Sequence, residues 1–136
     1  EPYGVLIVGA GWVSGAHIRA FEQNPYARVV AICSRRAETA RQKAADFQLS
    51  DCAVYTDVSE ALRDPRVDIA VICTPNHLHC EQVLLAAEAG KHVLIEKPIA
   101  LSYADALAMQ AAIHKAGVRS LVGYVLHYNP LFVTAK

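Results

Sequence analysis

Short apolar segments that alternate with helix-like segments restrict this chain to a small set of folds. Residues 4–8 and 69–73 are apolar throughout, which is typical of strands buried on both faces of a sheet. Further strands are expected at 28–33, 54–55, 92–95 and 120–123. Helices are expected at about 13–23, 37–47, 78–89 and 103–115, with a short one around 61–62. This order predicts an α/β fold of βαβ units with right-handed crossovers and a parallel sheet of about six strands.

Capping residues mark several of the expected helix ends. Asp57 and Ser102 are placed to accept backbone hydrogen bonds at helix starts, and Asp105 follows Ser102 at the spacing of a capping box. Gly90 and Gly117 stand where a helix ends in a left-handed residue. Asn129 and Pro130 indicate the start of another helix near the end of the chain.

The charge balance excludes several classes of partner. The 136 residues suit one domain, and 13 basic residues are matched by 13 acidic ones. A net charge of zero argues against a broad surface for nucleic acid or anionic membrane, so neither is an expected partner. No apolar run approaches the roughly 18 residues that span a bilayer. Any anion must therefore be bound at a local site.

The cysteines and histidines do not form a metal-binding pattern. Cys33, Cys52, Cys73 and Cys80 contain no C-x-x-C pair, and three of them lie in or beside apolar runs. This favours reduced, partly buried thiols and a cytoplasmic location. His77, His79 and Cys80 begin a helix without a matching ligand set elsewhere, so no metal is predicted.

A glycine turn directly follows the first strand. Gly9 permits a tight turn, and Gly11 lets a diphosphate approach the backbone of the following helix. Ser14 replaces the third glycine of the usual G-x-G-x-x-G motif, yet is small enough for close packing. The alternative is a glycine-rich turn without a ligand, but its position in a βαβ unit favours a Rossmann-type doubly wound sheet with three αβα layers. The predicted cofactor contacts here are Gly9, Ala10, Gly11, Trp12 and Val13.

The end of the second strand carries basic residues where NAD sites carry an acid. Ser34, Arg35 and Arg36 occupy this position, and the next acid is Glu38. A guanidinium group matches a phosphate, so these three residues are predicted to bind the 2′-phosphate of NADP, with NAD as the alternative cofactor. The alternative is that Arg35 and Arg36 are only a solvated basic pair at a helix start.

Polar residues also follow the fourth, fifth and sixth strands, whose carboxyl ends meet at one edge. The segment after the fourth strand is either a cofactor contact or a plain turn with a helix cap; the contacts predicted there are Cys73, Thr74, Pro75, Asn76 and His79. Glu96 and Lys97 follow the fifth strand as cofactor-site residues or as a surface ion pair. Tyr124 and His127 are predicted to lie on the substrate side.

Four segments together resemble the glucose–fructose oxidoreductase/inositol dehydrogenase family, known as Gfo/Idh/MocA. They are V-G-A-G at 8–11 with Ser14 and His17, C-T-P-N-H-L-H at 73–79, G-K-H-V-L-I-E-K-P at 90–98, and residues 123–130. The resemblance covers essentially the whole chain. E-K-P with the upstream T-P-N-x-x-H is specific at this spacing, whereas the glycine motif is not.

The resemblance implies roles for particular residues. Lys97 would be the catalytic residue at the nicotinamide, Glu96 its neighbour, and Pro98 would follow a cis peptide bond. Residues 1–123 would form the NAD(P)-binding domain, and residues 124–136 would begin the connection to a C-terminal domain outside this chain. That domain would supply the substrate pocket, an Asp-x-x-x-His element and the contacts of a homo-oligomer.

These observations predict an NAD(P)-dependent oxidoreductase. Hydride would pass between the nicotinamide and a hydroxyl or carbonyl carbon, with a sugar or cyclitol as the substrate. The alternative is a non-catalytic dinucleotide sensor on the same fold, because a fold does not determine chemistry.

Overall fold

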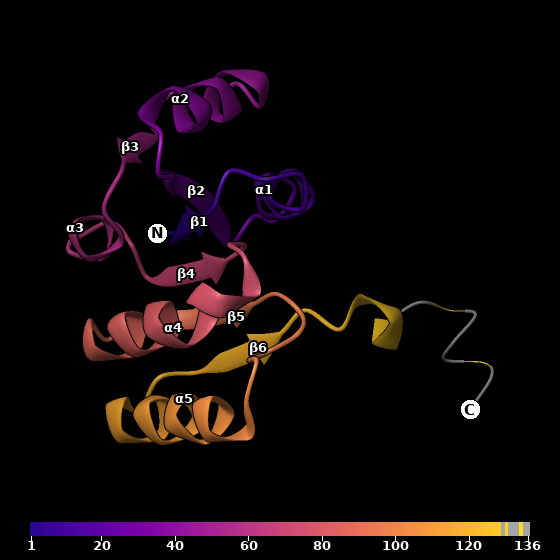
Figure 1. Ribbon diagram of the computed structural model, residues 1–136. Coiled ribbons are helices and arrows are strands. Elements are labelled where there is room, and N and C mark those ends of the chain that lie inside the picture. The colour runs from indigo at the N-terminus through magenta and orange to yellow at the C-terminus, as the bar shows by residue number, and fades with distance from the viewer. Residues whose placement is uncertain (129, 131–133, 135–136) are drawn as a thin grey trace.

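The apolar runs form one parallel sheet of six strands, in the order β3-β2-β1-β4-β5-β6 (Figure 1). The computed structural model describes residues 1–128, 130 and 134. The predicted fold class is confirmed, and no strand end differs from its predicted position by more than one residue. The strands are β1 (Tyr3–Val8), β2 (Ala27–Cys33), β3 (Ala53–Tyr55), β4 (Ile69–Ile72), β5 (His92–Ile95) and β6 (Ser120–Val122).

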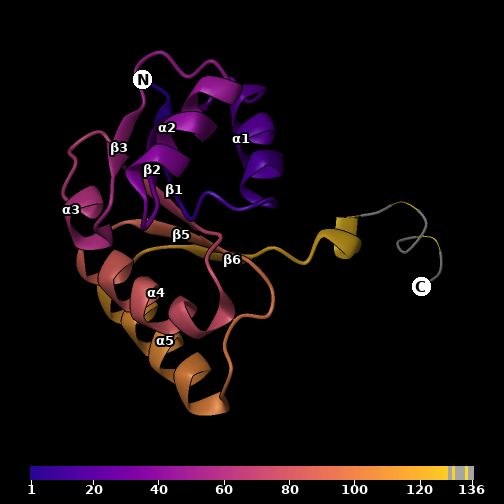
Figure 2. The same cartoon turned by 45° about the horizontal axis from the view of Figure 1, so that its top comes forward.

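Helices cover both faces of the sheet. The buried faces of α1 (Ser14–Glu22) and α2 (Ala37–Asp46) pack on one side of it. On the other side lie α3 (Val58–Leu62), α4 (His79–Glu88) and α5 (Tyr103–Ala116), and Figure 2 shows α4 beside α5. A 3-10 turn, η1 (Asn76–Leu78), replaces the expected first residue of α4. The helix start predicted at Asn129 falls on a residue outside the described ones.

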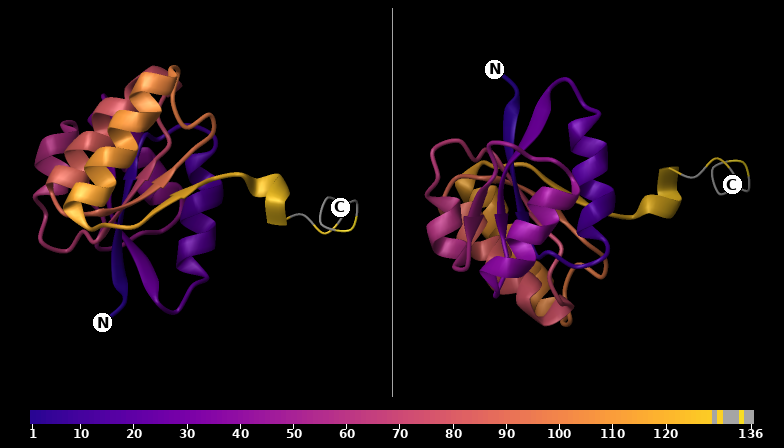
Figure 3. Two further views of the ribbon diagram at one scale, coloured as in Figure 1. Left: turned by 90° about the horizontal axis from the view of Figure 1, so that it is seen from below. Right: turned by 90° about the horizontal axis from the view of Figure 1, so that it is seen from above.

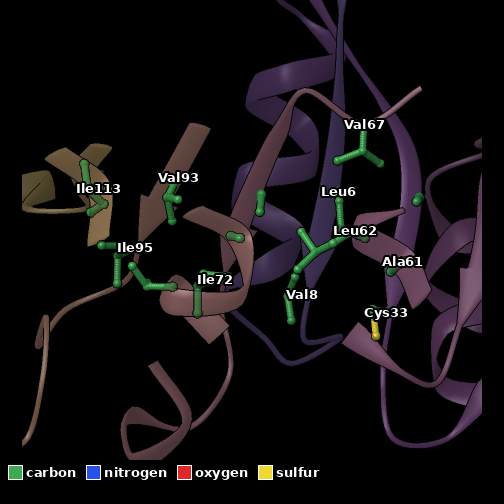
Figure 4. Close-up of a cluster of buried hydrophobic side chains, with 14 of the residues drawn as sticks. Leu6, Val8, Cys33, Ala61, Leu62, Val67, Ile72, Val93, Ile95 and Ile113 are labelled. Carbon is green, nitrogen blue, oxygen red and sulfur yellow. The ribbon is translucent and has the colours of Figure 1, made fainter. Parts of the chain in front are cut away.

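The core consists of two apolar clusters, one on each face of the sheet. Successive strand side chains point to opposite faces, so β1 sends Val5 and Ile7 toward α1 and α2, and Leu6 and Val8 toward α3 and α4. All four are buried. Figure 4 shows the cluster on the side of α3 and α4, which also contains Ile72. Burial on both faces explains why β1 is apolar at consecutive positions.

The layer that contains α1 and α2 covers the sheet unevenly. These helices contact β1, β2 and β3. Leu121 of the edge strand β6 pairs in register with Leu94 and remains 51% exposed. A second 3-10 turn, η2 (Val125–Tyr128), lies away from the sheet beyond β6 (Figure 3).

The predicted caps are confirmed. The Asp57 carboxylate accepts the backbone N–H of Glu60 at 2.8 Å, and the Ser102 hydroxyl accepts that of Asp105 at 3.0 Å. Gly90 and Gly117 follow α4 and α5 with φ of 70° and 67°. After these glycines the chain enters β5 and β6 at the amino edge of the sheet.

The cysteines and the helix lengths bear on two further predictions. All four cysteines carry free thiols, and Cys33 and Cys73 are buried. In the part of the chain that the structure describes, no helix is both long and apolar enough to cross a membrane. The cytoplasmic location stays a prediction.

We expect Gly4→Ala to lower the free energy of unfolding by at least about 2 kcal/mol, because a Cβ at this position would overlap the Arg66 carbonyl oxygen. Chemical denaturation measures this loss. Ser120→Ala, a change on the exposed edge strand, is the control and should shift the free energy by less than about 0.5 kcal/mol. Equal effects of the two substitutions would contradict the close approach of β1 to the segment before β4.

Candidate functional site

A cleft of about 590 Å³ opens at the carboxyl ends of β1, β2 and β4. This is the edge at which open parallel sheets bind ligands, and the volume is in the range of small-molecule sites. The structure brings nine of the predicted residues together in its walls: Gly9, Ala10, Gly11, Ser34, Arg35, Arg36, Cys73, Thr74 and Pro75.

Gly9 allows the turn after β1 to pack against the end of β4. Its φ is +101°, a conformation that side-chain-bearing residues rarely adopt. A Cβ at this position would lie 2.9 Å from both the carbonyl carbon and the carbonyl oxygen of Cys73. The Gly9 N–H donates to the Cys33 carbonyl at 2.8 Å, so the turn is fixed to β2 as well.

The backbone amides that follow are available to a ligand. Among the described residues, the N–H groups of Ala10, Gly11, Trp12 and Val13 have no hydrogen-bond acceptor. They precede α1, whose amino end carries the positive end of the helix dipole. Free amides at a helix start form a site for a phosphate group.

The carbonyl of Gly11 is held from two sides. The buried Ser14 hydroxyl donates to it at 2.6 Å, and Lys43 Nζ of α2 donates to it at 3.2 Å. Ser14 therefore anchors the turn as well as fitting the space of the absent third glycine. Lys43 thus brings a cation to the turn. The sequence did not indicate this contact, because no spacing rule relates a residue of α2 to residue 11.

The electrostatic character of the cleft comes from arginines. Arg35 and Arg36 are exposed, and within the described residues neither forms an ion pair. Burial, with smaller contributions from Asp57 and Glu60, raises the pKa of the Cys33 thiol to about 11. Burial, followed by the charge of Glu96, raises the pKa of Cys73 to about 12. Both thiols are therefore neutral at pH 7, and the cleft favours an anion near Arg35.

Glu96 and Lys97 do not form the surface ion pair considered from sequence. Glu96 is buried; its Oε1 lies 2.8 Å from His17 Nε2, and its Oε2 accepts the backbone N–H of Lys97 at 3.2 Å. Lys97 is exposed, and no described carboxylate pairs with its ammonium group. Pro98 follows a cis peptide bond, as the resemblance implies. The arrangement leaves the Lys97 amine free for a ligand.

Several predicted residues lie outside the walls of this cleft. Trp12 is 93% exposed on the turn, Val13 follows it, and Asn76 is exposed in η1. Tyr124 follows β6 in the chain, and His127 belongs to η2, which Figure 3 shows away from the sheet. Their predicted substrate contacts, like the contacts of Glu96 and Lys97 with a cofactor, stay predictions.

His79 differs most from its prediction. It was expected to contact the cofactor, yet it is fully buried, and both ring nitrogens lie 3.0 Å from backbone carbonyl oxygens. In this structure it has no exposed atom for a ligand to contact, because the side chain is packed inside the protein.

Sequence reasoning also missed parts of the cleft wall. Gln82 of α4 accepts the Thr74 hydroxyl at 2.5 Å and thereby holds the loop after β4. The spacing of Thr74 and Gln82 across a loop and a 3-10 turn carries no helical or strand signal. The remaining lining residues that were not predicted are Val8, Cys33, Thr39, Thr56, Val58 and Leu78.

Comparison with known proteins also identifies an NAD-binding Rossmann fold. The model of a family described as "Oxidoreductase family, NAD-binding Rossmann fold" matches residues 3–124. A 4-carboxy-2-hydroxymuconate-6-semialdehyde dehydrogenase from Sphingobium sp. is 36% identical over 93% of the chain and 39% of its own length. An inositol 2-dehydrogenase/D-chiro-inositol 3-dehydrogenase from Lactiplantibacillus plantarum is 34% identical over 97% of the chain and 38% of its own length.

Solved structures share the fold closely. GenD2 from gentamicin A biosynthesis, in complex with NAD, has a TM-score of 0.92 and 32% identity over 99% of this chain and 38% of its own. The Y186F mutant of KijD10, a 3-ketoreductase from Actinomadura kijaniata in complex with TDP-benzene and NADP, has a TM-score of 0.91 and 26% identity over 99% of this chain and 41% of its own. The chain thus spans about two fifths of the length of these proteins.

Two glycine substitutions separate the ligand role of the turn from its structural role. A Cβ at Gly11 would meet no atom within 4 Å, so Gly11→Ala should change the free energy of unfolding by less than about 0.5 kcal/mol. The same methyl group would stand where a diphosphate approaches, so we expect NADPH affinity to fall at least about 10-fold. Quenching of Trp12, the sole tryptophan of the chain, measures binding.

Gly9→Ala is the matched variant. It should lower both the free energy of unfolding and the NADPH affinity, because the backbone conformation of Gly9 and its contact with Cys73 exclude a side chain. If Gly11→Ala bound NADPH as tightly as the wild type, the turn would not be the diphosphate site.

Proposed function

This chain belongs to the oxidoreductase family with an NAD-binding Rossmann fold, and we propose that it is the cofactor domain of a dehydrogenase or reductase that acts on a hydroxyl or carbonyl carbon. The observation that carries the proposal is the row of free amides from Ala10 to Val13, beside an open Gly11 and the cationic Arg35. A diphosphate satisfies these amides, and an adenosine ribose then reaches the end of β2.

The residues of this chain divide the work between binding and proton transfer. The turn amides and the amino end of α1 hold the diphosphate, while Thr74 and Pro75 line the path from the adenosine half toward the end of β5. The nicotinamide, when bound, supplies or accepts the hydride. Lys97, with its amine free of ion pairs in the described residues, holds the substrate oxygen and transfers its proton. The sensor alternative has no use for such an amine.

NADP is the cofactor that we favour over NAD. Arg35 and Arg36 line the cleft beyond β2, where a carboxylate would be needed to accept hydrogen bonds from a free 2′-hydroxyl group. Ser34 lies in the same wall and adds a hydroxyl donor. A guanidinium group offers the donors and charge that a 2′-phosphate requires.

Arg35→Asp should reverse the preference between NADPH and NADH, because it replaces a phosphate donor with a carboxylate that repels phosphate and accepts from a ribose hydroxyl. We expect NADPH affinity to fall by about 100-fold, as for the loss of a charge-assisted contact. Fluorescence titration with both nucleotides gives the ratio of dissociation constants.

Arg41→Asp makes the same charge change on the exposed face of α2, outside the cleft wall, and serves as the control. It should leave the ratio of the two dissociation constants within about twofold, a change below 0.5 kcal/mol. An unchanged ratio in Arg35→Asp would refute the choice of NADP, and equal changes in both variants would reduce it to overall charge.

Lys97→Ala should lower kcat by at least about 100-fold in the full-length protein, because a proton-transfer group is lost, while NADPH affinity stays within about twofold. Turnover of a panel of polyols and their ketones, including myo-inositol, provides the assay. Lys115→Ala on the exposed side of α5 is the control for charge. A nucleotide-binding protein with no turnover on any member of the panel, and no effect of Lys97→Ala, would favour the sensor.

The rest of the enzyme follows from the length of the relatives. Because these proteins are more than twice as long as this chain, we propose that residues from 124 onward lead into a domain that completes the substrate pocket and the contacts of a homo-oligomer. The substrate that we propose is a sugar or cyclitol. This choice is supported by residues 123–130, which resemble members of the family that act on sugars, and by the name of the inositol dehydrogenase. The semialdehyde dehydrogenase is named for another class of substrate.

A further inference from the structure

His79 connects two loops that come from different strands. Its Nε2 lies 3.0 Å from the carbonyl oxygen of Thr74, in the loop after β4. Its Nδ1 lies 3.0 Å from the carbonyl oxygen of Pro98, in the loop after β5. The side chain is fully buried at the start of α4, so water does not compete for these contacts.

The chemistry of the two contacts makes this histidine specific. Both partners are carbonyl oxygens, which only accept hydrogen bonds. A neutral imidazole carries one N–H and donates to one of the two carbonyls, whereas a doubly protonated ring donates to both. An imidazole ring is rigid, and its two nitrogens point in different directions. It therefore sets the separation of the two loops in a way that an apolar residue of the same size does not.

The loop after β5 is the one that carries Lys97. The backbone N–H of Lys97 donates to Glu96, whose other oxygen contacts His17 of α1. On the opposite side of Lys97, the carbonyl of Pro98 is held by His79 of α4. The backbone around the free amine is thus anchored from both faces of the sheet, through α1 before Lys97 and through α4 after it.

The other loop lines the cofactor cleft. Thr74 is one of its wall residues, and the Thr74 hydroxyl is held separately by Gln82. A shift of the Thr74 carbonyl relative to Pro98 would therefore displace Lys97 relative to the wall of the cleft. Displacements of about 1 Å in a catalytic group can cost a factor of about 100 in rate.

We propose that His79 is a positioning residue, which sets the place of Lys97 relative to the cofactor cleft by bridging the Thr74 and Pro98 carbonyls. It contacts neither the cofactor nor the substrate. The catalytic consequence rests on the proposed function, whereas the bridge itself does not.

The bridge is tested by hydrogen–deuterium exchange in His79→Phe, which keeps a ring of similar size but removes both ring nitrogens and with them every donor. We expect exchange in segments 74–78 and 96–101 to rise by about 10-fold or more, because local opening no longer has to break the contacts that His79 makes with the two loops. Val83→Ala, a fully buried change on the same helix, is the packing control and should not single out these two segments. Equal exchange in His79→Phe and the wild type would overturn the bridge.

His79→Gln keeps a side-chain donor and provides the result if the phenylalanine variant does not fold. An amide in this place can donate to one or both carbonyls, so exchange in at least one segment should stay closer to the wild type than in any donor-free variant, such as His79→Leu. Faster exchange in both segments, equal to that of His79→Leu, would also overturn the bridge. These measurements do not depend on turnover, so they remain decisive if the protein is not an enzyme.

The positioning role is tested by a double-mutant cycle with Lys97→Ala in the full-length protein, assayed on the polyol panel. His79→Phe alone should lower kcat by about 10- to 100-fold and leave NADPH affinity within about twofold. In the Lys97→Ala background, the same change should have less than about a twofold effect on kcat, because the group that it positions is gone. Effects that multiply would show a general structural role and overturn the proposal.

Discussion

The fold of this chain around its ligand site depends on the close contact between Gly9 and the end of β4. With no side chain at residue 9, the turn after β1 approaches Cys73 to a distance that a Cβ would block. The strands β1 and β4 end side by side, and the amides of the following turn have no acceptor among the described residues. The absence of a side chain at residue 9 thus allows the turn whose amides we propose as an anion site at the start of α1.

The distribution of charge around this corner is consistent with its geometry. Burial keeps the thiols of Cys33 and Cys73 neutral, so the charged groups of the cleft wall are Arg35 and Arg36. At the end of β5 the only buried carboxylate is directed to His17 instead of the neighbouring lysine, within the described residues. The basic part of the cleft wall is suited to phosphate, and Lys97, outside that wall, has an amine without an ion-pair partner among the described residues. The groups that we propose for binding and for proton transfer thus follow different strands of one sheet.

Sequence alone predicted the features that repeat or that obey local rules. Apolar runs gave the strands, and Asp57 and Ser102 marked helix starts because capping is a contact between residues three apart. The glycine turn and the arginines followed from their places after β1 and β2. The contacts made by Lys43, Gln82 and His79 were not predicted. Each joins two segments that come together only because of how the helices pack on the sheet. His79 was predicted to contact the cofactor, whereas the structure buries it against two backbone carbonyls, since sequence shows that a polar side chain is near an edge but not whether it faces out or in.

The most direct measurement of the central claim is an NMR titration of the chain labelled with ¹⁵N at its seven glycines, with NADPH added stepwise. We expect the amide signals of Gly9 and Gly11 to shift and saturate together, as the diphosphate binds to the turn. Gly90 and Gly117, which precede β5 and β6 at the opposite edge of the sheet, should keep their positions. Unshifted signals for Gly9 and Gly11 at a saturating concentration, or shifts confined to Gly90 and Gly117, would contradict it.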